Sequence, residues 1–324
     1  MEELSPDRSS CTPECPIYLT RGHVTQRLHL QRNRIPEPAA ILELFKPVTW
    51  FPPMWAFLCG AVSAGTAFTG QWPLILLGMV VAGPLVCAAS QAVNDWFDRE
   101  VDALNEPHRP IPSGRIPGRW GLGLALLWTG VSAGAGWFLG TWGFIATLVA
   151  LVLAWGYSAP PFRFKQDGWI GNLAVGISYE GLAWVTGAAV LLGGALPPGP
   201  ILLVALVYSL GAHGIMTLND FKAIEGDRAM GIRSLPARLG ADNAARVAVV
   251  VMLAAQAVVV GLLLHWGHPG HAVAVVALMC VQAAMMVRFL QAPRERALWL
   301  SGLGVPLYVS GMMVTAFALR AGGA

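Results

Sequence analysis

Apolar segments about as long as a membrane-spanning helix recur along the chain, and they constrain its fold more than any other feature. Nine are present, at residues 48–68, 72–93, 120–138, 141–158, 169–191, 200–218, 244–264, 271–290 and 297–319. Only 12% of the residues are charged, whereas soluble domains contain roughly 25%. The sequence therefore predicts an all-α integral membrane protein with nine transmembrane helices.

The positive charges test this count of spans. All but one of the 21 Lys and Arg residues lie in the amino-terminal segment, in the even-numbered connections between the predicted spans or within three residues of such a connection, and the exception is Arg320. Because positive residues collect on the cytoplasmic side, we expect the amino terminus and these connections to be cytoplasmic. The expected organisation is a polar tail at residues 1–40 and one nine-helix domain at residues 41–320. A net charge of +3 lacks the basic excess of a nucleic-acid-binding protein, so no nucleic-acid partner is expected.

A cluster of aspartates follows the second predicted span. Asp95, Asp98 and Asp102 are spaced i, i+3 and i+7, which puts them on one face if the span continues as a helix. Like charges on one face repel each other unless a cation lies among them. Mg²⁺ is suited to such a site, because it prefers a few carboxylates together with phosphate oxygens and water.

A second cluster follows the sixth span and begins with the same Asn-Asp pair. Asn219 and Asp220 match Asn94 and Asp95, and Asp227 comes seven residues after Asp220. A basic segment with proline follows each cluster, which suggests an internal duplication. The second and sixth spans run in the same direction, so both clusters can face one cavity and hold a diphosphate through Mg²⁺. The alternative is that both are ordinary polar loops.

Several longer segments, taken together, resemble a known family. The first cluster has the pattern Asn-Asp-x-x-Asp-x-x-x-Asp at residues 94–102. With it, the chain resembles the UbiA superfamily of intramembrane prenyltransferases, and within it most closely the chlorophyll synthase branch. Further segments carry this resemblance, at residues 46–55, 105–117, 157–166, 168–172, 219–227 and 231–236.

This resemblance implies a UbiA-like bundle of nine helices and a prenyl transfer that requires Mg²⁺. The expected reaction joins geranylgeranyl or phytyl diphosphate to the propionate of bacteriochlorophyllide a and releases diphosphate. The expected location is the bacterial inner membrane, cytoplasmic or intracytoplasmic, with the lipid bilayer around the protein. Pigment-biosynthesis or photosynthetic assembly proteins are possible partners.

Individual roles follow from these residue types. We expect Asp95, Asp98 and Asp102 to hold one Mg²⁺, and Asp220 and Asp227 to hold another. Asn94 and Asn219 would orient the aspartates or complete the metal shells. The candidates for contact with the diphosphate oxygens are Arg109, Arg163, Lys165 and Lys222, and Tyr157 is expected to face the same group.

Two polar residues lie inside predicted spans, where ionisable groups are costly and often functional. Glu180 would pair with a cation, bind the pigment, or form a hydrogen bond with a neighbouring helix. His213 precedes Asp220 by two helical turns on the same face of the sixth span. It is a candidate axial ligand for the pigment's Mg, and the alternative is a packing role.

Other functions remain open at this point. A cation-coupled transporter would place its charged residues near the middle of the bilayer, whereas these aspartates lie at one predicted edge. A pigment-binding structural protein would need several His ligands within spans, and only His213 qualifies. Among enzymes, the alternatives are a chlorophyll synthase that uses chlorophyllide a and a prenyltransferase of quinone or haem synthesis.

Overall fold

A computed structural model describes residues 35–322, and in this part of the chain all the regular elements are helical. The helices that build the membrane domain are α3 (Phe51–Ser63), α4 (Trp72–Val80), α5 (Ala88–Asn105), α6 (Trp120–Gly136), α7 (Gly140–Ser158), α8 (Gly168–Gly176), α9 (Ala183–Leu191), α10 (Gly199–Asp220), α13 (Ala241–His265), α14 (Pro269–Gln291) and α15 (Pro293–Gly322). Short helices α2 (Pro38–Leu44), α11 (Ile224–Ala229) and α12 (Leu235–Leu239) complete the set. Of the predicted tail, residues 1–34 lie outside the described part.

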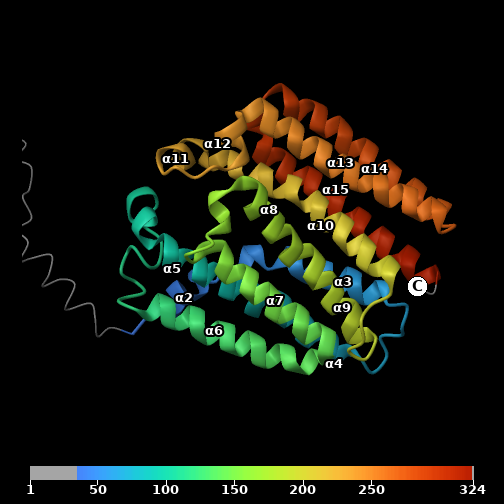
Figure 1. Cartoon of the computed structure of the whole chain (residues 1–324), viewed down its shortest axis with the longest axis horizontal. Helices are drawn as coiled ribbons and strands as arrows, with labels where there is room; N and C mark the ends of the chain where they lie inside the picture. Colours follow the sequence, from blue (N-terminus) through green and yellow to red (C-terminus); the bar gives the residue numbers. More distant parts are fainter. Residues whose placement is uncertain (1–34, 323–324) are drawn as a thin grey trace, which may run out of the picture.

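Each of the nine predicted spans falls on a helical stretch. By length and hydropathy, seven helices within residues 35–322 can cross a membrane. The number is smaller than nine because α6 and α7 count as one stretch, Trp120–Ser158, and because α3 has only 13 residues. Gly140, at φ 78°, separates α6 from α7, which pack against each other (Figure 1). The all-helical, multi-pass membrane architecture is thus confirmed.

Close backbone contact joins α3 to α9. A Cβ atom on Gly60 would collide with the Trp184 carbonyl group, and one on Gly187 would collide with the Phe57 carbonyl group. Small residues allow helices to approach closely in a membrane, where no hydrophobic effect drives them together. Trp184, buried at this contact, stacks on Tyr208 of α10 with ring centroids 5.8 Å apart, so the pair also anchors α10.

Two of the long helices contain π-helical segments. Val81–Cys87 joins α4 to α5, and Ile177–Leu182 joins α8 to α9. The first contains Pro84, which has no N–H group for the helical hydrogen-bond pattern. Such segments often occur at functional sites. Here both of them line the central cavity described below.

The part of α5 and the end of α10 that carry aspartates lie at one end of the bundle, with α2, α11 and α12 (Figure 1). The backbone links the connection between α7 and α8 to the segment between α11 and α12. Arg233 N donates to Gln166 O at 3.0 Å, and Gly168 N donates to Arg233 O at 2.9 Å. Asp167 caps α8 by accepting from the backbone N–H groups of Trp169 and Ile170. This end of the molecule is therefore held together by several connections that are far apart in sequence.

Candidate active site

A cavity of about 660 Å³ lies between the helices, and it opens beside both aspartate clusters. At one end its lining is polar, with Asn94, Asn219 and Lys222. The rest of the wall contains many small and aliphatic side chains, several of them from α7, α8, α10 and α15, together with the polar side chains of Gln91, Tyr179 and Glu180. The lining thus combines groups that bind anions and metals with groups that bind hydrocarbon.

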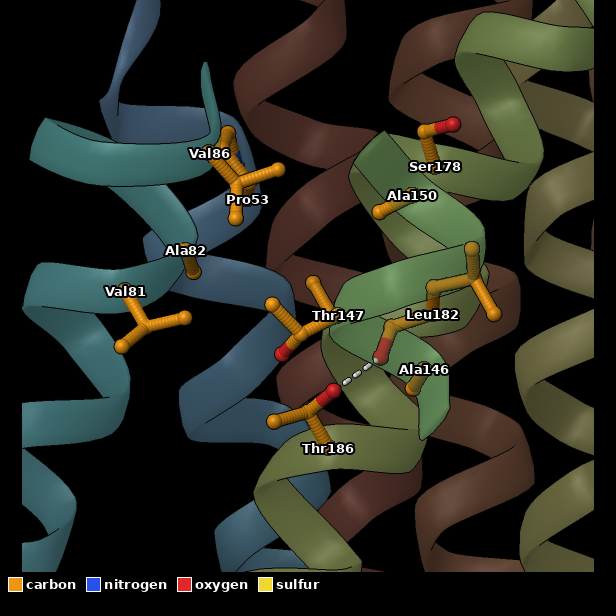
Figure 2. Close-up of a pocket in the computed structure, with 11 residues that line it drawn as sticks. Pro53, Val81, Ala82, Val86, Ala146, Thr147, Ala150, Ser178, Leu182 and Thr186 are labelled. Carbon is orange, nitrogen blue, oxygen red and sulfur yellow. Dashed lines mark hydrogen bonds between the residues drawn. The ribbon is translucent and has the colours of Figure 1, made fainter. Parts of the chain in front are cut away.

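A smaller pocket of about 30 Å³ continues the large cavity, because the two share Pro53, Ala82, Val86, Ala150 and Ser178. Figure 2 shows its lining, with Thr147 and Thr186 on facing helices. Both hydroxyl groups donate to carbonyl oxygens of their own helices, Thr147 to Gly143 at 2.9 Å and Thr186 to Leu182 at 2.7 Å. The polar atoms of these threonines are therefore satisfied, and the pocket is suited to an apolar group.

The aspartates of the first cluster all lie on α5, as the spacing predicted. Each contacts a basic side chain. Asp95 accepts from Lys46 Nζ at 2.7 Å, Asp102 accepts from Arg109 at 2.9 Å, and Asp98 pairs with Lys165. The other carboxylate oxygen of Asp95, Oδ2, is buried and has no hydrogen-bond partner among the described residues.

The second cluster is built differently. Asp220 ends α10, a 3₁₀ turn at Phe221–Ala223 follows, and Asp227 lies in α11. Asp220 accepts from the Asn172 amide of α8 at 3.1 Å, and Asp227 accepts from the Ser234 hydroxyl. Uncharged groups thus hold both aspartates, and Lys222 is exposed at the mouth of the cavity.

The two clusters meet around Tyr157. This residue lines the cavity near the end of α7 and lies within electrostatic reach of Asp98, Asp220 and Asp227. The expectation that both clusters serve one site stays a prediction, and Tyr157 is the residue that would lie between them.

Basic residues surround the same region. Lys46 and Arg163 are the two non-glycine residues with positive φ within residues 35–322, at 46° and 42°. Such backbone conformations are strained and cluster at functional sites. Burial lowers the pKa of Lys165, and the Asp98 carboxylate opposes this shift. The Nε atom of Arg163 is buried and has no hydrogen-bond partner in the described part of the chain.

The predicted site residues differ in how directly they line the cavity. Asn94, Tyr157, Asn219 and Lys222 line it, whereas Arg109, Arg163 and Lys165 lie beside the clusters. His213 is buried at 6% exposure and packs on the Trp169 ring at 5.2 Å, outside the cavity lining. Its predicted contact with the pigment stays a prediction.

Two residues with clear contacts in the site were not among the candidates, namely Lys46 and Asn172. Both occur in the segments that carry the family resemblance. Neither stands next to an aspartate in the sequence, so spacing alone gave no signal for them. The structure brings them to Asp95 and Asp220 through contacts between helices.

The donor set suits a hard divalent cation that also binds phosphate oxygens. Within residues 35–322, no group of three or more His, Cys, Asp or Glu side chains could hold a metal ion. Mg²⁺, however, usually takes one or two carboxylates and completes its shell with water and substrate phosphates. The buried, unpartnered Oδ2 of Asp95 is the kind of oxygen that fits this arrangement.

Comparison with known proteins defines the class of this molecule. The UbiA prenyltransferase family matches residues 50–310, so the chain belongs to this family and is a membrane prenyltransferase. It is 57% identical to the bacteriochlorophyll synthase 33 kDa chain of Rhodobacter capsulatus over 91% of this chain and 98% of that relative. It is 38% identical to the chloroplastic chlorophyll synthase of Arabidopsis thaliana, over 86% of this chain and 73% of that protein.

A solved structure supports the fold independently. The UbiA homolog from Archaeoglobus fulgidus, bound to GPP and Mg²⁺, superimposes with a TM-score of 0.60. The match covers 87% of this chain and 99% of the homolog, at 21% sequence identity. The UbiA-like bundle expected from the sequence is thus confirmed, and that homolog binds Mg²⁺ together with a prenyl diphosphate.

Proposed function

We propose that the protein acts as the bacteriochlorophyll synthases do, by esterifying the propionate of bacteriochlorophyllide a with an isoprenyl diphosphate, geranylgeranyl or phytyl. One structural observation supports this most. Two aspartate clusters and several basic residues lie beside a cavity whose lining is mostly apolar. Such a cavity is suited to a substrate with a diphosphate head and a long hydrocarbon tail. The similarity to named bacteriochlorophyll synthases supports the choice of acceptor.

The chain's own residues would bind and orient the diphosphate. Lys165, Arg109, Arg163 and Lys222 are the candidates for contact with its oxygens, and charge-assisted hydrogen bonds of this kind are short and strong. Tyr157 would lie against the same group. The aspartates, with Asn94 and Asn219, would hold Mg²⁺, which would neutralise the negative charge that develops on the leaving diphosphate.

The proposed reaction breaks the bond between the allylic carbon and the diphosphate oxygen, and the diphosphate leaves with the electron pair. A propionate oxygen then forms the new bond to that carbon. Because a propionate is already ionised near neutral pH, no general base is required. The apolar wall and the small pocket would exclude water from the cation and accommodate the tail.

The charge pattern supports an orientation with the amino terminus and the aspartate-bearing connections on the cytoplasmic side of a bacterial inner membrane. This orientation would bring both substrates to the site from the cytoplasm or its membrane leaflet. Proteins of pigment biosynthesis or photosynthetic assembly are the expected partners. A domain boundary near residue 40 agrees with the start of α2 at Pro38.

A membrane assay tests the proposal. Membranes that contain the protein are incubated with geranylgeranyl diphosphate and Mg²⁺, and bacteriochlorophyllide a, chlorophyllide a and hydroxybenzoate are offered in parallel. We expect esterified bacteriochlorophyllide to form fastest and to disappear when Mg²⁺ is chelated. Preferential prenylation of hydroxybenzoate would contradict the proposal, and preferential use of chlorophyllide a would move the protein to the chlorophyll synthase group.

A further inference from the structure

A buried carboxyl group without a partner lies in the wall of the large cavity. Glu180, in the π-helical segment Ile177–Leu182, lines this cavity and is 6% exposed. Its Oε2 atom is buried without a hydrogen-bond partner, and no described Lys, Arg or His lies within 4.0 Å of the carboxyl group. A buried polar group without a partner is costly unless a ligand supplies one.

Glu180 lines the large cavity but not the small apolar pocket. Ser178 lines both the pocket and the large cavity, whereas Glu180 lines only the large one. Residues two apart on a helix do not face the same way. Glu180 instead lies within electrostatic reach of Cys59 in α3 and Tyr308 in α15. Glu180 therefore belongs to a part of the large cavity outside the small apolar pocket.

Glu180 also lies well away from the aspartate clusters. It follows Asn172, the residue that binds Asp220, by eight positions on the same helical stretch. At about 1.5 Å per residue, this separation carries Glu180 about 12 Å deeper into the bundle. It is therefore too far from the diphosphate end to bind the diphosphate, and an all-carbon tail would offer it no partner.

An acceptor pigment does offer a partner at that depth. Its propionate must lie at the diphosphate end to react, so the macrocycle extends from there into the cavity. Small residues on three helices leave room for a flat ring along this wall, namely Ala154 of α7, Ala174 and Gly176 of α8, and Ala212 of α10. The acetyl group of the pigment is on the pyrrole ring next to the one that bears the propionate. It would therefore lie deeper in the cavity than the propionate and would reach Glu180.

Resting on the proposed function, we infer that Glu180 selects the acceptor by donating a hydrogen bond from its carboxylic acid to the acetyl oxygen of bacteriochlorophyllide a. Chlorophyllide a carries a vinyl group in place of this acetyl group and cannot accept such a bond. A site with a hydrogen-bonding group rejects an analogue that lacks the matching group, because its own buried polar group is then left unpaired.

Two substitutions at this position separate recognition from folding. Glu180→Gln keeps an N–H donor of nearly the same shape, and Glu180→Leu removes it. Gln256→Leu is the matched control, because Gln256 is fully buried in α13, has an amide without partners among the described residues, and lies outside the cavity lining. Membranes with each variant are assayed with both pigments, and kcat and KM are measured separately.

We expect the preference of the wild type for bacteriochlorophyllide a over chlorophyllide a to fall about tenfold in Glu180→Leu, through KM. Glu180→Gln should keep most of the preference, and Gln256→Leu should keep all of it. An unchanged preference in Glu180→Leu would overturn the inference, and so would an equal loss for both pigments. If the wild type esterifies neither pigment, the proposed function itself fails, which is a distinguishable result.

Discussion

In the first aspartate cluster each carboxylate lies against a Lys or Arg side chain, whereas in the second cluster no described Lys or Arg lies within 4.0 Å of either carboxylate. The partners of the second cluster are the amide of Asn172 and the hydroxyl of Ser234. The first cluster is thus largely neutralised by the chain itself. The carboxylates of the second have no such basic partner among the described residues, so a bound cation would be their main source of positive charge.

This difference shows that a repeated motif does not create repeated environments. The first cluster lies on one continuous helix, α5. Its lysine partners come from two other parts of the chain, Lys46 from the segment before α3 and Lys165 from the connection between α7 and α8. In the second cluster a 3₁₀ turn separates Asp220 from Asp227. The side chains that donate hydrogen bonds to these aspartates come from α8 and from the segment before α12. In the first cluster, an arriving diphosphate would draw the lysines from aspartate to phosphate, and the aspartates would then be free to bind metal.

The largest expected effect comes from removing one carboxylate of each cluster. Asp220→Asn and Asp95→Asn should each lower the esterification rate by about 10³ or more, because each removes a carboxylate expected to hold the Mg²⁺ that would stabilise the leaving diphosphate. If the second cluster depends more on metal, Asp220→Asn should also raise the Mg²⁺ concentration needed for half-maximal rate more than Asp95→Asn does. Rates measured against Mg²⁺ concentration check this, and equal shifts would break the comparison.

A smaller effect is expected from the cations of the first cluster. Lys165→Met should raise KM for the prenyl diphosphate by about 10- to 100-fold, since it removes a charge-assisted contact worth about 1.5–3 kcal/mol. It also leaves Asp98 without its partner. Lys165→Arg is the matched control that keeps the charge. A change in kcat alone would argue against a role in binding the diphosphate.

The neutral partner of the second cluster offers a third test. Asn172→Ala removes the amide that orients Asp220, and a supporting contact of this kind is worth about 10- to 100-fold in metal affinity or activity. The matched control is Asn243→Ala, because Asn243 is exposed and its amide contacts only the Leu239 carbonyl oxygen. Titration of activity with Mg²⁺ should separate the variants, and identical curves would contradict the role of Asn172.

The smallest effect is expected at the exposed ion pair that joins α2 to the connection after α5. Arg115 contacts both carboxylate oxygens of Glu43, at 2.6 and 2.9 Å, and lowers the pKa of Glu43. The stabilisation from this shift is present above the pKa that Glu43 has in the unfolded chain and is lost as the pH falls. Arg115→Ala should cost less than about 1 kcal/mol, as exposed pairs do, with esterification unchanged.

Thermal unfolding in detergent at two pH values checks this last prediction. The difference in Tm between wild type and Arg115→Ala should shrink at acidic pH. A large loss of esterification in the variant would instead mean that the position of α2 matters to the first cluster, which would extend the comparison beyond the aspartates themselves.

Much of the architecture could be predicted because it depends on local patterns. The length of the apolar segments limits the chain to membrane helices, and the spacing of the first three aspartates fits the continuous helix α5. The sequence left the role of Glu180 open, because a cation, the pigment and a neighbouring helix are all possible partners for its carboxyl group. The surroundings of Glu180 include residues of α3 and α15. The sequence alone does not show that these helices lie near the segment Ile177–Leu182.

The sequence by itself determined the membrane helices, the family and the residue types of the site, because hydrophobic length, charge distribution and short motifs act within one segment. Only the tertiary structure decided which groups meet. It brought Lys46 to Asp95, Asn172 to Asp220 and an unpartnered Glu180 to the cavity wall. These contacts join residues far apart in the chain, and they depend on how closely the helices pack and where the π-helical segments turn their side chains.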